Sequence, residues 1–260
     1  KTPNQKTTLP NGLRIITVPM ENPTVTVLVL VETGSKYEAK EESGISHFLE
    51  HMCFKGTAKR GTAFDVTKEL DGIGSSYNAF TGHEYTGYYA KAEARHFEKI
   101  LDVVSDIYLN PKLEATEIEK EKGVIADEIN MYEDKPDRKA VEYFMRLLYG
   151  DQPAGWDITG TKDIIRSFGR DNFVRYRGEH YLPQSTIVLV SGGIPYDKAV
   201  TAVTKSFTGM PAGEKHGKLP VREKQSKPST FVFNKKTDQT HIVVGFRSHN
   251  LYHPDRYILG

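Results

Sequence analysis

One short segment with two histidines, Ser43–Lys55, constrains the fold of this chain more than any other feature. On a helix, at about 100° per residue, its apolar side chains gather on one side. Those side chains are Ile45, Phe48, Leu49 and Met52. His47, Glu50 and His51 fall on the opposite side. The pattern therefore predicts an amphipathic helix, with Ser43 as its N-cap and Gly56 at its end.

The spacing of the two histidines indicates a metal site on this helix. His47 and His51 are four residues apart, so their imidazoles can converge on one ion, and Glu50 lies between them. Zinc accepts histidine nitrogen readily, and its catalytic sites use three protein ligands and a water. The alternative is a solvated polar face that carries two histidines by chance, because short motifs of this kind do occur without function.

The rest of the chain alternates β and helical patterns, which predicts an α+β fold. We expect an antiparallel β-sheet packed by several helices. A Pro10-Asn11-Gly12 turn joins the first two strands in a hairpin. The predicted strands cover 7–9, 13–18, 24–32, 75–81, 85–92 and 186–190, and the predicted helices cover 63–71, 94–109, 114–132, 138–149, 162–168, 170–181 and 197–207.

A change in composition after residue 208 indicates a domain boundary. Residues 209–228 are rich in Gly, Pro and Lys and show no apolar period, so we interpret them as a linker after a first domain at 1–208. Residues 229–260 then resemble the start of a second, truncated domain, with predicted strands at 230–233 and 240–246. We expect the chain to be a fragment of something longer.

The charge balance and the single cysteine exclude several classes of partner and site. The net charge is +1, from 35 basic and 34 acidic residues, and no apolar run reaches the length that spans a bilayer, so we expect neither a nucleic acid nor a membrane as partner. Cys53 is alone, which excludes an intramolecular disulfide and favours a packing role over metal ligation. This slightly favours the cytoplasm and leaves the periplasm and the mitochondrial matrix open.

Two glutamates on a later predicted helix are further candidates. Glu121 and Glu128 are seven residues apart and share one face. They lie at the edge of an apolar stripe formed by Ile118, Ile125, Ile129 and Tyr132. A carboxylate turned toward a core is costly unless it is paired, hydrogen-bonded or bound to metal. The alternative is a pair of surface glutamates on a charged helix.

Three segments together resemble a known family. His-x-x-Glu-His is the inverse of the thermolysin-type motif and is typical of the inverzincins. The chain combines it with SGISHFLEHMCFKGT, SSYNAFTGHEYTGYYAKA and VIADEINMYEDKP, and so resembles the pitrilysin/insulinase family of zinc peptidases, which includes the catalytic subunit of the mitochondrial processing peptidase. In that family the third ligand is a glutamate separated from the second histidine by about 76 residues. Glu128 matches it, and Glu121 matches a supporting glutamate seven residues earlier.

The resemblance implies a role for each matching residue. His47, His51 and Glu128 would bind one zinc ion per chain, and Glu50 would be the general base. Glu121 would orient a histidine or hold charge near the metal. The segment Gly74–Thr81 resembles the family's edge strand, on which substrate adds as a further strand. Asn78 and Ala79 are the candidates for that contact, and an ordinary strand is the alternative.

The function that the resemblance implies is zinc-dependent endoproteolysis of peptides or unfolded segments. The family's fold is a clamshell of two homologous halves, so a second half is expected in the same polypeptide or in a partner chain, and a homodimer is one further arrangement. The alternatives are a non-catalytic peptide-binding or scaffold subunit of the same family, a protein with a purely structural zinc, and a fragment inactive without its second half. Non-catalytic relatives typically lose the histidines and glutamates that this chain keeps.

Overall fold

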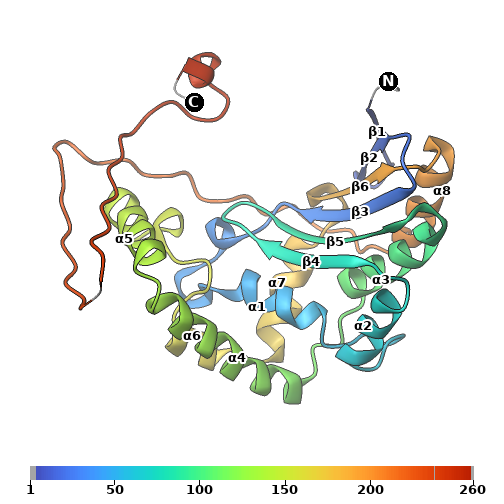
Figure 1. Cartoon of the computed structure of the whole chain (residues 1–260), viewed down its shortest axis with the longest axis horizontal. Helices are drawn as coiled ribbons and strands as arrows, with labels where there is room; N and C mark the ends of the chain where they lie inside the picture. The colour runs from blue at the N-terminus through green and yellow to red at the C-terminus, as the bar shows by residue number, and fades with distance from the viewer. Residues whose placement is uncertain (1–3, 237, 259–260) are drawn as a thin grey trace.

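The computed structural model describes residues 4–236 and 238–258, and most of them form one mixed sheet covered by helices (Figure 1). The sheet has six strands in the order β1-β2-β6-β3-β5-β4. All neighbouring pairs are antiparallel except β2 and β6, which are parallel. The predicted α+β class is confirmed. The strands are β1 Gln5–Thr8, β2 Arg14–Pro19, β3 Thr24–Val31, β4 Ser76–Thr81, β5 Thr86–Glu93 and β6 Thr186–Gly192.

The alternation of side chains along β3 explains why the helices lie on one face of the sheet. Successive side chains of a strand point to opposite faces. The buried set is Val25, Val27, Val29 and Val31, and the residues between them are only half-buried. Helices α1 to α4, α6 and α7 lie on one side of the sheet in Figure 1, and the buried valines belong to the same apolar core as their inner faces.

The helices follow the periodic segments of the sequence closely. Their bounds are α1 Ile45–Cys53, α2 Ala63–Asp71, α3 Phe97–Leu109, α4 Ala115–Glu133, α5 Pro136–Tyr149, α6 Lys162–Ser167, α7 Arg170–His180 and α8 Tyr196–Phe207. Over the described residues, no helix combines the length and the apolar character that crossing a bilayer requires.

Helix α1 lies in the middle of the helical layer. It packs against the edge strand β4 on one side, and against α4 and α7 on the others (Figure 1). Because it is covered on several sides, both of its faces are buried: Phe48 and Leu49 are fully buried, and His47 is only 9% exposed. The polar face predicted for this helix therefore does not face bulk solvent but the neighbouring helix α4.

A buried arginine, Arg60, stabilises the segment that follows α1 through ion pairs. The Arg60 side chain is 2% exposed, and its guanidinium reaches Asp106 on α3 at 2.6 Å and Glu69 on α2 at 3.0 Å. A third carboxylate, Asp102, lies 2.5 Å away. Burying an arginine is costly unless its donors are satisfied, and these three partners satisfy them. The exit from α1 is thereby tied to α2 and α3.

Two predictions about local structure were wrong. Helix α1 begins at Ile45 after Gly44, which has a φ of 97°, and Ser43 does not cap it. The segments 230–233 and 240–246 are not strands, and the described residues from 208 to 253 contain no helix or strand. A strand requires a hydrogen-bonded partner, and no ladder includes these segments. The proposed domain bounds at 208 and 229 stay a prediction.

Candidate metal centre

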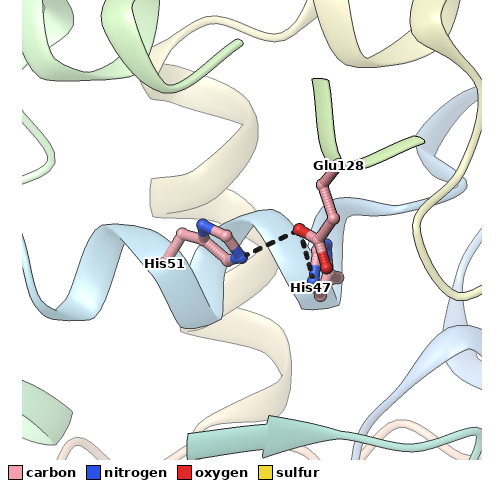
Figure 2. Close-up of side chains that lie close together, drawn as sticks. All are labelled: His47, His51 and Glu128. Atoms are coloured by element: carbon pink, nitrogen blue, oxygen red, sulfur yellow. Dashed lines mark ion pairs between the residues drawn. The ribbon is translucent and has the colours of Figure 1, made fainter. Parts of the chain in front are cut away.

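Two helices bring together the three residues predicted to hold a metal. His47 and His51 come from successive turns of α1, and Glu128 comes from α4 and points at both (Figure 2). The Oε2 atom of Glu128 lies 3.6 Å from Nε2 of His47 and 3.6 Å from Nε2 of His51. The three ligand atoms all lie within 4.8 Å of one another. Residues 77 positions apart in the sequence thus form one cluster.

These distances fit a zinc ion. With Zn–N and Zn–O bonds of roughly 2.0–2.2 Å, the ligands of a tetrahedral ion are separated by about 3.3–3.6 Å. The observed 3.6 Å spacings need only a small adjustment. Two histidines and one carboxylate also match the donor set of a catalytic site, because three protein ligands leave a fourth position for water. The residues present therefore fit the metal.

Glu121 fixes the orientation of His51. Its Oε1 lies 2.8 Å from Nδ1 of His51, and the side chain is almost fully buried. If that nitrogen carries the proton and donates it to Glu121, Nε2 keeps its lone pair toward Glu128, as metal ligation requires. Lys55 lies 2.5 Å from the other oxygen of Glu121 and balances its charge. The carboxylate thus connects His51 to Lys55, which follows the end of α1.

Tyr132 holds the remaining oxygen of Glu128. Its hydroxyl donates to Oε1 of Glu128 at 2.5 Å, and the Arg138 guanidinium lies over its ring. The bond leaves Oε2 directed toward the histidines. A glutamate held in this way presents one oxygen to the ion and keeps the second occupied, which favours ligation through a single atom.

The pKa values of the two histidines shift in opposite directions because their surroundings differ. Burial and the neighbouring His51 lower the pKa of His47 to about 4, so this ring is neutral at neutral pH. Burial also lowers the pKa of His51, but its bond to Glu121 and the nearby carboxylates outweigh that effect and raise it overall. Metal binding requires neutral imidazoles, so the raised pKa of His51 makes zinc binding more sensitive to low pH than His47 alone would. No described protein group bonds to Nδ1 of His47.

Glu50 lies on the same helix but makes a different contact. It receives a 2.5 Å hydrogen bond from Oγ1 of Thr81, the last residue of β4. Burial raises the pKa of Glu50, although the Thr81 bond and His51 act in the opposite direction. The pKa of a general base is best near the working pH, so a raised value suits proton transfer.

The predicted substrate-contact residues lie on an edge strand next to the site. Among the described residues, strand β4 pairs only with β5, so its other side has no partner strand there. Asn78 is exposed and Ala79 half-buried, and the Asn78 carboxamide oxygen accepts a 2.9 Å hydrogen bond from the Ala79 amide. Because β4 ends at Thr81, its direction leads from Asn78 to the contact with Glu50.

Three neighbours of the site were not identified from the sequence. Lys55 and Tyr132 each follow a site residue by one helical turn, at i+4 from His51 and Glu128, and this spacing could have indicated them. Tyr132 was assigned only to the apolar stripe. Thr81 carries no local signal, because its contact with Glu50 depends on the packing of β4 against α1.

Cys53 and a second histidine group are the other potential metal ligands, and their surroundings differ from those of the site on α1. Cys53 is fully buried and bonds to the Tyr88 hydroxyl, as expected for a packing residue, and burial raises its thiol pKa to about 11. His249, His253 and Asp255 also lie close enough to share an ion, but this group is largely exposed. Nδ1 of His253 already accepts a hydrogen bond from the Asp255 amide.

A groove of about 1280 Å³ between α5 and residues 225–247 includes none of the proposed ligands.

Comparisons with known proteins identify the family of this chain. The family described as Insulinase (Peptidase family M16) matches residues 14–162, and the Peptidase M16 inactive domain matches residues 167–260. An uncharacterized zinc protease of Rickettsia felis is 38% identical over 92% of this chain. This chain spans 57% of the length of that relative.

Solved structures share the fold. A protease from Helicobacter pylori superposes with a TM-score of 0.79 at 26% identity, over 85% of this chain and 54% of the other. The first half of the periplasmic protease PqqL from Escherichia coli gives a TM-score of 0.77 at 21% identity, over 85% of this chain and 49% of the other. The second likeness concerns the fold alone.

Proposed function

This chain belongs to the insulinase family of peptidases, family M16, and on that basis we propose that it is the metal-binding half of a zinc-dependent endopeptidase. The observation that carries the proposal is the convergence of His47, His51 and Glu128 at ligand spacing. In this proposal one zinc ion binds per chain, and Glu121 orients His51 from behind.

The chemistry assigned to the protein side chains is proton transfer. When bound, zinc would lower the pKa of a coordinated water to about 7 and polarise the scissile carbonyl. Glu50 would take the proton of the attacking water and pass it to the leaving amine. Its burial and raised pKa support this role, because the carboxyl then accepts a proton more readily than an exposed glutamate does. Thr81 holds one oxygen of Glu50 and leaves the other free to accept the proton.

We propose that substrate backbone adds to the free side of β4, with Asn78 and Ala79 making the contact. The position of the strand supports this, because it is an edge strand that ends at Thr81 beside Glu50. Strand addition uses main-chain hydrogen bonds, so it favours extended peptides over folded ones. The Asn78 carboxamide would have to leave the Ala79 amide before that amide could bind substrate.

Proline scanning of a peptide substrate tests the strand addition. Proline lacks an amide proton, so replacing a residue that bonds to β4 should lower kcat/KM by about fivefold, given roughly 1 kcal/mol for one lost hydrogen bond. The effect should alternate along the peptide, because every second residue of a strand faces the ladder. Equal cleavage of all proline peptides would exclude the contact with Asn78 and Ala79.

The second half of the peptidase is part of the proposal. We propose that residues 1–208 form the metal-binding domain, that 209–228 are a linker and that 229–260 begin a second homologous domain. The lack of any helix or strand across residues 209–228 supports a linker there. The exposed apolar side chains of Phe231, Phe233 and Phe246 support a further domain, because exposed apolar surface of this kind often marks an interaction site.

Metal analysis together with peptide hydrolysis tests the whole proposal. The protein assayed with its second half should cleave an unstructured peptide, lose that activity in a chelator and regain it with zinc. The chain alone should bind zinc but cleave weakly, because in this proposal the second half completes the substrate chamber. Bound zinc without cleavage by the complete protein would favour a structural metal, and absence of zinc would favour a non-catalytic subunit.

A further inference from the structure

The helix that carries both histidines begins without a cap of its own. Its N-cap residue is Gly44, which has no side chain to satisfy the free amides of the first turn. The first four amides of a helix have no partner within the helix, so they need acceptors from elsewhere. Ser46 lies in this turn, and His47 follows it directly.

Glu38 supplies the missing cap from outside the helix. Its Oε2 accepts the Gly44 amide at 2.8 Å, and its Oε1 accepts the Ser46 amide at 2.9 Å. The residue is only 3% exposed, so water cannot replace it easily. A carboxylate at a helix N-terminus also interacts favourably with the helix dipole. Both oxygens are used, which defines the direction as well as the position of the first turn.

The surroundings of this turn leave it little freedom. The Ser46 hydroxyl bonds to the Tyr176 hydroxyl at 2.7 Å, which bonds in turn to Thr33 at 2.7 Å. A Cβ atom at Gly44 would lie 2.7 Å from the carbonyl oxygen of Thr159, so the backbone of the turn is packed against that segment. The first turn of α1 is therefore held by one carboxylate, one tyrosine and one backbone contact.

We propose that Glu38 is a positioning residue for the metal centre, and that it sets where His47 stands relative to Glu128 by fixing the first turn of α1. This rests on the proposed zinc site. His47 is the ligand nearest to the capped turn, and it has no orienting partner of the kind that Glu121 gives to His51. Its place therefore depends on the backbone that carries it. Glu38 touches neither the ion nor the substrate in this role.

The test is zinc affinity in Glu38→Gln, with Glu41→Gln as the matched control. Glutamine keeps the length of the side chain but puts an amino group where one backbone amide needs an acceptor. We expect the zinc Kd, measured by competition with a chromophoric chelator, to rise by about tenfold or more, within the roughly 10–100-fold range of lost orienting partners. Glu41 is exposed near the same turn, so its variant changes the charge equally and should bind zinc like the parent. Burial raises the pKa of Glu38 to about 7, so measurements belong well above that pH.

Two further readouts separate positioning from a general structural role. The visible spectrum of the cobalt-substituted protein should differ between Glu38→Gln and the parent, because it reports the ligand geometry. The melting temperature of the zinc-free protein gives the loss of stability alone. A lower melting temperature with a zinc Kd within about twofold of the parent and an unchanged cobalt spectrum would overturn the proposal.

A second variant keeps the test decisive if Glu38→Gln does not fold. Glu38→Asp retains the charge but shortens the reach by one methylene, so zinc affinity should fall while the fold persists. Parent-like zinc affinity in the aspartate variant would contradict the proposal. If the parent itself binds no zinc, the proposed metal centre is wrong; if the parent binds zinc and Glu38→Gln binds it equally, only the role of Glu38 is wrong.

Discussion

Replacing Glu50 with glutamine is expected to lower kcat/KM for peptide hydrolysis by about 10²–10⁴-fold, the usual contribution of a general base. Zinc affinity should stay near that of the parent, because Glu50 is not one of the converging ligands. Glutamine has the same shape and can still accept the Thr81 hydroxyl through its carbonyl oxygen. What it loses is the ability to take a proton. The measurement pairs zinc content with initial rates, using the protein together with its second half.

The control for this experiment is Glu41→Gln. Glu41 is exposed and carries the same charge, so the substitution changes net charge without touching the site. It should hydrolyse peptide at the parent rate. If Glu50→Gln cleaved as well as Glu41→Gln, Glu50 would not be the base, and another group would have to accept the proton.

Replacing Glu128 with alanine should have the largest effect on the metal itself. Glu128 is the only negatively charged member of the converging set. Its removal should weaken zinc binding by more than the roughly 10–100-fold that loss of an orienting partner costs. Glu121→Ala, which removes the partner of His51 but no ligand, should fall within that smaller range. Comparing the two variants therefore shows whether loss of a ligand lowers zinc affinity more than loss of a residue that orients a ligand.

Zinc competition titrations of these variants need a control from the same helix. Asp127 is exposed and adjacent to Glu128, so Asp127→Ala removes one negative charge without altering the cluster. It should bind zinc like the parent. If Glu128→Ala bound zinc as tightly as Asp127→Ala, the third ligand would lie elsewhere, and the convergence of Glu128 on the histidines would have another cause.

The parts of this site that sequence analysis predicted are those that depend on helical period. His47 and His51 share a face because they are one turn apart, and the observed helix α1 covers both. Glu121 and Glu128 are two turns apart on α4, and both do face α1. The position at which α4 packs against α1 cannot be predicted from the helical period of either helix. It was expected only from the family resemblance.

The parts that were missed depend on contacts between distant segments. Glu38 caps α1 from a separate turn, and no local pattern relates it to Ser46. The expected N-cap, Ser43, was wrong because Glu38 and Gly44 provide another way to begin the helix. Thr81 reaches Glu50 only because the edge strand packs beside the helix.

The strands predicted at 230–233 and 240–246 show a second limit of prediction from local sequence. Their apolar and β-branched residues favour extended structure, which predicts two strands. Within the part of the chain that the structure describes, no neighbouring strand pairs with them, and Phe231, Phe233 and Phe246 are exposed. A β-strand forms hydrogen bonds with a neighbouring strand, so a strand-like sequence does not form one without that neighbour.

Zinc K-edge X-ray absorption of the zinc-loaded protein, repeated on His47→Ala and Glu128→Ala, tests directly whether these residues bind the metal. We expect two imidazole nitrogens and light oxygen donors at about 2.0–2.2 Å, with no sulfur shell. One imidazole should be lost in His47→Ala, and one oxygen in Glu128→Ala. A sulfur ligand in the parent, or a spectrum unchanged by both substitutions, would contradict a metal centre built on these residues.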